Sequence, residues 1–103
     1  MKHKRPIAVN PKLPARFSDT PNDARPASHM RWWGRPYIET EERGPGVSET
    51  QWLAWWPEGV RYDVRCLDGG AWDRPTCKGA FKSLAEAVAY AEALRDELLE
   101  EQV

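Results

Sequence analysis

The clearest hydrophobic pattern lies in residues 60–67, where apolar and polar side chains alternate. Alternation with a period of two is typical of a half-buried antiparallel strand. The Asp-Gly-Gly run at 68–70 predicts a hairpin turn, and residues 76–81 are the expected return strand. On the inner faces of these two strands we expect Val60, Tyr62, Val64 and Cys66, and then Cys77, Gly79 and Phe81.

Residues 51–56 are rich in aromatic side chains, and their β-propensity favours a third strand. Trp52, Ala54 and Trp56 would share one face of it, with Leu53 and Trp55 on the other. The run Pro57-Glu58-Gly59 predicts a tight turn after this strand. Residues 37–41 are expected to add an edge strand, where Pro36 is tolerated at the first position.

Residues 84–101 change to a helical period, with apolar side chains at three- and four-residue steps. Ser83 is a suitable N-cap, and Glu86 follows three residues later, as in a capping box. The apolar stripe consists of Leu84, Ala87, Val88, Ala91, Leu94 and Leu98. These patterns predict an α+β fold: a small antiparallel sheet of three or four strands, followed by one C-terminal helix packed on one face.

Residues 1–30 show neither period and hold five of the nine prolines. Frequent proline blocks both helix and ladder formation, so we predict a flexible arm over 1–30 and a sheet-plus-helix domain over 31–103. The alternative is an arm that orders on a partner. Its anchors would then be Ile7, Val9, Leu13 and Phe17.

The net charge of -1 hides an asymmetry between these two parts. The arm carries six Lys or Arg against two Asp, and the domain carries nine against fourteen Asp or Glu. A basic arm favours nucleic acid, whereas an acidic body repels phosphate. The basic start precedes no apolar segment of the signal-peptide kind, and no apolar run approaches the length of about 20 residues that a membrane span needs. We therefore expect a cytoplasmic protein without membrane contact.

The residues that usually carry chemistry do not form a recognisable motif in this sequence. Both histidines, His3 and His29, fall in the arm, and Cys66 and Cys77 lack the spacing of a metal site. A disulfide across the hairpin is geometrically open, but a reducing setting favours two buried free thiols. The sequence has no Ser-His-acid set, nucleophile elbow or phosphate loop. We expect a protein that is not an enzyme and uses no metal or cofactor.

The tryptophans give the strongest indication of binding. One helix covers only one face of a sheet, so the other Trp-bearing face needs residues 31–38, a second subunit or a ligand to cover it. Aromatic residues dominate protein interfaces. The candidate protein-binding residues are Trp52, Trp55, Trp56 and the acidic helix end with Glu97, Glu100 and Glu101.

A basic sheet face is the alternative site, because such a face can enter a groove of duplex DNA. The candidate nucleic-acid-binding residues are Lys2, Lys4, Arg5, Arg61, Arg65, Arg74 and Lys78. On the outer face of the strand over residues 60–67, Asp63 lies between Arg61 and Arg65. Pairing of Asp63 with an arginine would make it an ordinary mixed-charge surface instead.

Residues 60–94 resemble the three-strand-plus-helix DNA-binding domain of the AP2 and phage-integrase arm type. The resemblance rests on Gly79-Ala80-Phe81, then Ser83, Glu86, Ala87, Tyr90 and Ala93. It implies that Arg61, Arg65, Arg74 and Lys78, with Trp55 or Trp72, face DNA. The acidic domain and the Trp-rich first strand depart from that family, whose domains are basic with an arginine-dense first strand.

Taken together, these features predict a small non-enzymatic binding protein that acts through protein–protein contacts or self-association. Small phage or plasmid regulators and inhibitors share this general make-up, which is an analogy of composition and fold. The alternative is a DNA-binding module that uses the basic arm together with Arg61 and Arg65.

Overall fold

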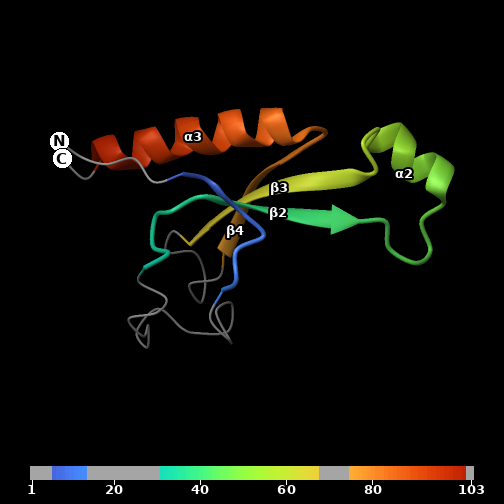
Figure 1. The fold of residues 1–103 in the computed structure, drawn as a ribbon, viewed down its shortest axis with the longest axis horizontal. Helices are drawn as coiled ribbons and strands as arrows, with labels where there is room; N and C mark the ends of the chain where they lie inside the picture. The colour runs from blue at the N-terminus through green and yellow to red at the C-terminus, as the bar shows by residue number, and fades with distance from the viewer. Residues whose placement is uncertain (1–5, 14–30, 68–74, 102–103) are drawn as a thin grey trace.

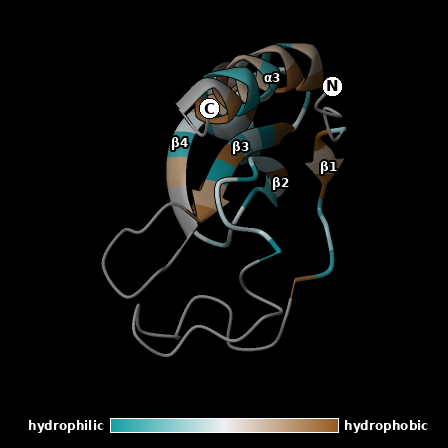
Figure 2. Cartoon of the chain, turned by 90° about the vertical axis from the view of Figure 1, so that its left-hand side faces the viewer, coloured by the Kyte–Doolittle hydropathy of each residue, from teal (hydrophilic) through white to brown (hydrophobic). Residues whose placement is uncertain are grey.

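The structure is a computed structural model that describes residues 6–13, 31–67 and 75–101 (Figure 1). Its elements in chain order are β1 (Ala8–Val9), β2 (Tyr37–Glu42), α2 (Glu49–Trp55), β3 (Val60–Leu67), β4 (Pro75–Phe81) and α3 (Leu84–Glu101). The strands form one sheet in the order β1-β2-β3-β4, and α3 lies across one of its faces (Figure 2). The α+β class, with a C-terminal helix on one face of a small sheet, is therefore confirmed.

The sheet is mixed rather than wholly antiparallel, which corrects the prediction. β2, β3 and β4 pair antiparallel, but β1 runs parallel to β2, with Ala8 opposite Tyr37. β1 belongs to the stretch that the proline pattern assigned to the arm. Asn10 follows this short pairing with a positive φ of 50°, and its amide side chain bonds both the backbone N–H and the hydroxyl of Thr40, each at 2.9 Å.

The core lies between α3 and the face of the sheet that carries Ile38 and Val64. Both residues are fully buried, as are Ala87 and Ala91 on α3. Alanines at these positions allow the helix to approach the strands closely. Ile7, Tyr62, Phe81, Val88 and Leu94 surround this centre as partly buried neighbours. The Ser83 hydroxyl accepts a hydrogen bond from the backbone N–H of Glu86 at 3.2 Å, so the predicted N-cap of α3 is confirmed.

A β-bulge in β4 changes which side chains share a face. Val64 lies opposite Gly79, but Arg65 lies opposite Cys77, so β4 carries one extra residue at Lys78. Because directly opposed residues point to the same face, Cys77 joins Arg65 on the face away from α3. The prediction that Cys77 faces inward with Gly79 and Phe81 is therefore wrong. Cys66 is buried, Cys77 is exposed and no disulfide joins them, so the expectation of two buried thiols is corrected.

Residues 51–55 belong to helix α2 and Trp56 is its C-cap, so the prediction of a strand over residues 51–56 is wrong. α2 begins after Ser48, whose hydroxyl accepts a hydrogen bond from the backbone N–H of Gln51 at 3.1 Å. The backbone N–H of Trp56 closes the last turn on the carbonyl of Trp52 at 2.7 Å. The turn predicted at 57–59 is confirmed, because the N–H of Gly59 bonds the carbonyl of Trp56 at 2.7 Å.

Candidate protein-binding surface

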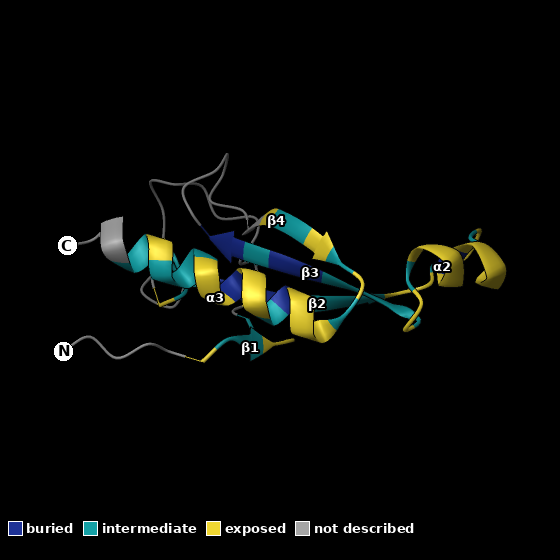
Figure 3. Ribbon diagram, turned by 90° about the horizontal axis from the view of Figure 1, so that it is seen from above, coloured by how far each residue is buried: buried dark blue, intermediate teal, exposed yellow. Residues whose placement is uncertain are grey.

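α2 projects from the end of the β2–β3 hairpin and lies apart from the body of the sheet (Figure 3). Most of its residues are exposed, and Trp52 is its one buried residue. A helix of seven residues is too short to be stable by itself in water. α2 therefore depends on the contacts that hold it to the hairpin.

Trp52 makes the main attachment of α2. Its indole Nε1–H donates to the carbonyl of Gly59 at 2.8 Å. The rings of Trp52 and Trp56 pack at a tilt, with centroids 6.2 Å apart. Gly59 has φ +83, which a residue with a Cβ rarely adopts, and a Cβ there would meet Leu53 at 3.9 Å. Gly59 thus suits this turn through its positive φ, and its carbonyl holds Trp52 of α2.

Two large apolar side chains of α2 remain in solvent. Trp55 is 50% exposed and Leu53 is 41% exposed. Successive helical residues are rotated by about 100°, so Leu53 and Trp55 lie about 160° apart around the helix axis, on either side of the attached face that carries Trp52. Leu53, Trp55 and the half-buried Trp56 form what we call the α2 apolar surface. Isolated exposed apolar residues are ordinary, but two large ones on a projecting helix of seven residues make that helix a candidate contact surface.

The charged residues next to this surface are mostly acidic. Glu42 ends β2, Glu49 lies in the first turn of α2 and Glu58 lies in the turn after it, and all three are exposed. Glu58 also accepts a hydrogen bond from the hydroxyl of Tyr62 at 3.0 Å, and this bond raises the pKa of that phenol. The exposed Arg43 donates to the carbonyl of Val47 at 2.9 Å.

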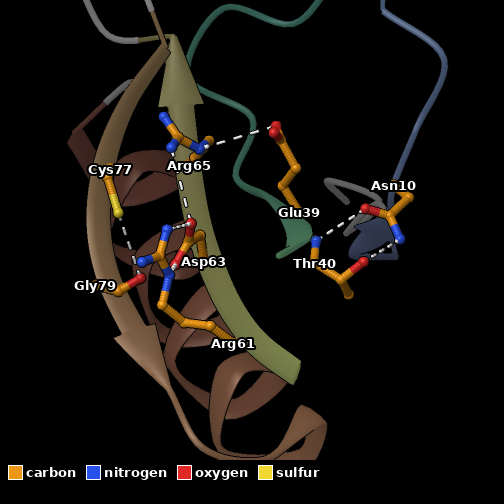
Figure 4. Close-up of polar contacts among 8 residues, drawn as sticks. All are labelled: Asn10, Glu39, Thr40, Arg61, Asp63, Arg65, Cys77 and Gly79. Carbon is orange, nitrogen blue, oxygen red and sulfur yellow. Dashed lines mark hydrogen bonds and ion pairs between the residues drawn. The ribbon is translucent and has the colours of Figure 1, made fainter. Parts of the chain in front are cut away.

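The open face of the sheet, away from α3, carries the arginines of the alternative site (Figure 4). Arg61 donates two hydrogen bonds, of 2.9 and 3.0 Å, to the buried carboxylate of Asp63. These bonds raise the pKa of the Arg61 guanidinium. Arg65 lies 3.8 Å from Asp63 and 3.8 Å from Glu39. The expected pairing of Asp63 with an arginine is confirmed, so carboxylates already neutralise both guanidinium groups.

The remaining predicted site residues are scattered or lie outside the described residues. Lys78 is the extra residue of the β4 bulge, and its carbonyl accepts a hydrogen bond from Tyr90 at 3.2 Å. Glu97 lies near the C-terminal end of α3, at the opposite end of the molecule from α2 (Figure 1). The structure therefore separates Glu97 from the tryptophans. Not described are Lys2, Lys4, Arg5, Trp72 and Arg74, and the side chains of Glu100 and Glu101.

The other described tryptophans pack at the far end of the sheet. The rings of Trp32 and Tyr37 meet edge to face at 5.7 Å, and Arg35 stacks over Trp32 at 4.6 Å. Trp33 forms a bridge with Leu67, and both Tyr37 and Leu67 are almost fully buried. Residues 31–36 thus cover one end of the open face. The sequence predicted residues 31–38 as one possible cover, beside a second subunit or a ligand.

Three findings concern the wider class of the protein. Within the described residues, no group of three or more His, Cys, Asp or Glu side chains could hold a metal ion. None of the helices in the described part of the chain combines the length and the apolar character needed to cross a membrane. Comparison of the chain with protein families, with curated proteins and with solved structures finds no match in any of the three.

Proposed function

We propose that the chain is a small non-enzymatic binding protein that acts through protein–protein contacts made by the α2 apolar surface. The half-exposed Trp55, on a helix held out from the sheet, is the observation that supports this proposal most strongly. Tryptophan is the residue type most enriched among interface residues that dominate binding energy. The bond from Trp52 to Gly59 fixes α2 before binding, which reduces the entropy lost on association.

The contribution of Trp55 can be estimated from its exposure. A large aromatic side chain buries about 200 Å², so the exposed half of Trp55 offers about 100 Å² of further burial. At about 25 cal/mol per Å², its complete burial contributes about 2.5 kcal/mol, or roughly sixtyfold in Kd. A partner that covers Leu53 and Trp56 as well would gain further affinity.

Two observations weigh against the alternative of DNA binding through the open face. Asp63 and Glu39 neutralise Arg61 and Arg65, and Glu41 lies directly opposite Arg61 in the sheet register. This part of the face holds three acids against two arginines, and such a face attracts no phosphate. A role of the basic arm in DNA binding stays a prediction, which a salt series with and without residues 1–30 would test.

The test is an affinity capture from lysate with matched variants. Leu53 and Leu84 are 41% and 40% exposed, so Leu53→Ala and Leu84→Ala remove the same side chain at the same exposure from α2 and α3. We expect one partner that the wild type and Leu84→Ala retain and that Leu53→Ala and Trp55→Ala lose. Circular dichroism checks that each variant is folded. Equal retention by all variants, or equal loss with Leu84→Ala, would contradict the proposal.

A further inference from the structure

The surroundings of the α2 apolar surface carry an excess of negative charge. Residues 41–61 contain four glutamates and two arginines. Arg43 is engaged with the carbonyl of Val47, and Arg61 is engaged with the buried Asp63. The exposed charges that a docking partner meets first are therefore Glu42, Glu49 and Glu58 against Arg43, because a bond to a neutral carbonyl leaves the positive charge of Arg43 in place. The balance beside the surface is three negative charges to one positive charge.

This charge pattern separates the classes of partner. Nucleic acid and anionic lipid are repelled by exposed carboxylates beside the contact surface. A second copy that docked α2 against α2 would place like charges opposite each other, which costs several kcal/mol across an interface. A protein with an apolar site bordered by lysine or arginine gains from both the apolar contact and the charge complementarity.

We propose that the α2 apolar surface, in the binding role proposed above, takes a protein partner whose apolar site is bordered by lysine or arginine. Leu53 and Trp55 enter the apolar site, while Glu42, Glu49 and Glu58 face the basic border. Complementary charges act mainly on the rate of association, and salt screens them over about 8–10 Å. The proposed partner therefore binds faster at low salt than at high salt.

The experiment uses the full chain and two synthetic helical peptides as probes. Both peptides carry the same leucine stripe, which is flanked by lysines in one and by glutamates in the other. Stopped-flow tryptophan fluorescence gives the association rate, and calorimetry gives Kd. We expect the lysine peptide to bind at least about tenfold more tightly than the glutamate peptide, with an association rate that falls as salt is added.

Charge variants locate the effect. Glu49→Lys with Glu58→Lys should weaken binding of the lysine peptide by about tenfold or more. Glu86→Lys with Glu97→Lys makes the same change of net charge on α3 and should leave Kd within about twofold. Because Glu49 lies at the start of α2, Glu42→Gln with Glu58→Gln provides a second reading that leaves this helix intact. It should weaken binding by about threefold.

The possible failures can be told apart. Equal binding of both peptides that Trp55→Ala abolishes would overturn the charge inference and leave the proposed function standing. Equal effects of the α2 and α3 charge variants would overturn it as well, since the attraction would then be that of the whole acidic domain. Binding of neither peptide, or of duplex DNA in preference to both, also overturns it. The capture with Leu53→Ala judges the proposed function separately.

Discussion

Replacing Asp63 with asparagine tests whether the charges on the open face hold the sheet together or are available to a ligand. Asp63 is 1% exposed, and each of its oxygens accepts a hydrogen bond from Arg61, at 2.9 and 3.0 Å. Arg65 approaches the same carboxylate at 3.8 Å. Asp63→Asn keeps the size of the side chain, but it removes the charge and turns one acceptor into a donor that faces the guanidinium.

The expected cost follows from these contacts. A hydrogen bond to a charged group contributes about 1.5–3 kcal/mol, and the substitution removes one such bond and weakens the other. Breaking a fully buried ion pair costs about 3–5 kcal/mol, but Arg61 and Arg65 are 34% and 27% exposed, so water recovers part of that cost. We therefore expect Asp63→Asn to lower the free energy of unfolding by about 2–3 kcal/mol.

Urea unfolding, followed by circular dichroism, measures this change. Glu39→Gln is the matched control, because Glu39 is 41% exposed and meets Arg65 at 3.8 Å. An exposed pair of this kind contributes less than about 0.5 kcal/mol. The denaturant slope should stay the same in both variants, which shows that stability alone has changed. A cost for Asp63→Asn that is no larger than that of Glu39→Gln would refute the assignment of a structural role to this network.

Three further predictions concern single side chains. Burial raises the pKa of Tyr37 well above its usual value of about 10. The unfolded chain then loses this proton first, so the free energy of unfolding should fall above pH ~10 by up to ~1.4 kcal/mol per pH unit for this group. Tyr37→Phe should reduce that fall in urea titrations and leave the smaller part that comes from the raised pKa of Tyr62. Trp52→Phe deletes the bond to Gly59 and should raise hydrogen exchange of the α2 amides by about fivefold, with little change in the global midpoint. Ser48→Ala removes the N-cap hydroxyl that accepts from the backbone N–H of Gln51, and it should raise hydrogen exchange of the α2 amides by a similar factor. Global unfolding of either variant would show that α2 is not an independent unit.

The parts of the fold that follow from the sequence are those in which several local signals agree. In β3 the alternation is complete, and the structure places Asp63 and Val64 on opposite faces as that alternation requires. At the start of α3 the cap residue Ser83 is followed at once by the helical period, and the helix begins at the next residue. Each of these elements is specified by its own residues, without reference to a distant segment.

β1 and the bulge in β4 depend instead on distant contacts. β1 has only two residues, which is too short for a period to be recognised, and it is held by pairing with β2 and by the contact of Ile7 with the core. The bulge leaves one trace, which is Gly79. A Cβ at Gly79 would lie 3.0 Å from the ring of Phe81, so a larger residue here would require that ring to shift by a few tenths of an ångström. The glycine marks the crowding, but it does not reveal the shift of register that turns Cys77 outward.

α2 is a helix, whereas its residues predict a strand. Its residues have high β-propensity, but Ser48 and Gln51 have the same spacing as Ser83 and Glu86, which is the start signal of a capped helix. In a strand, Trp55 and Trp56 would point to opposite faces of the sheet, and each face would need a cover. In a helix they belong to one projecting unit that the sheet does not cover. Trp55 and Trp56 therefore leave no sheet face that needs a cover. A partner would instead dock on α2, where Trp55 and Leu53 are the exposed apolar residues.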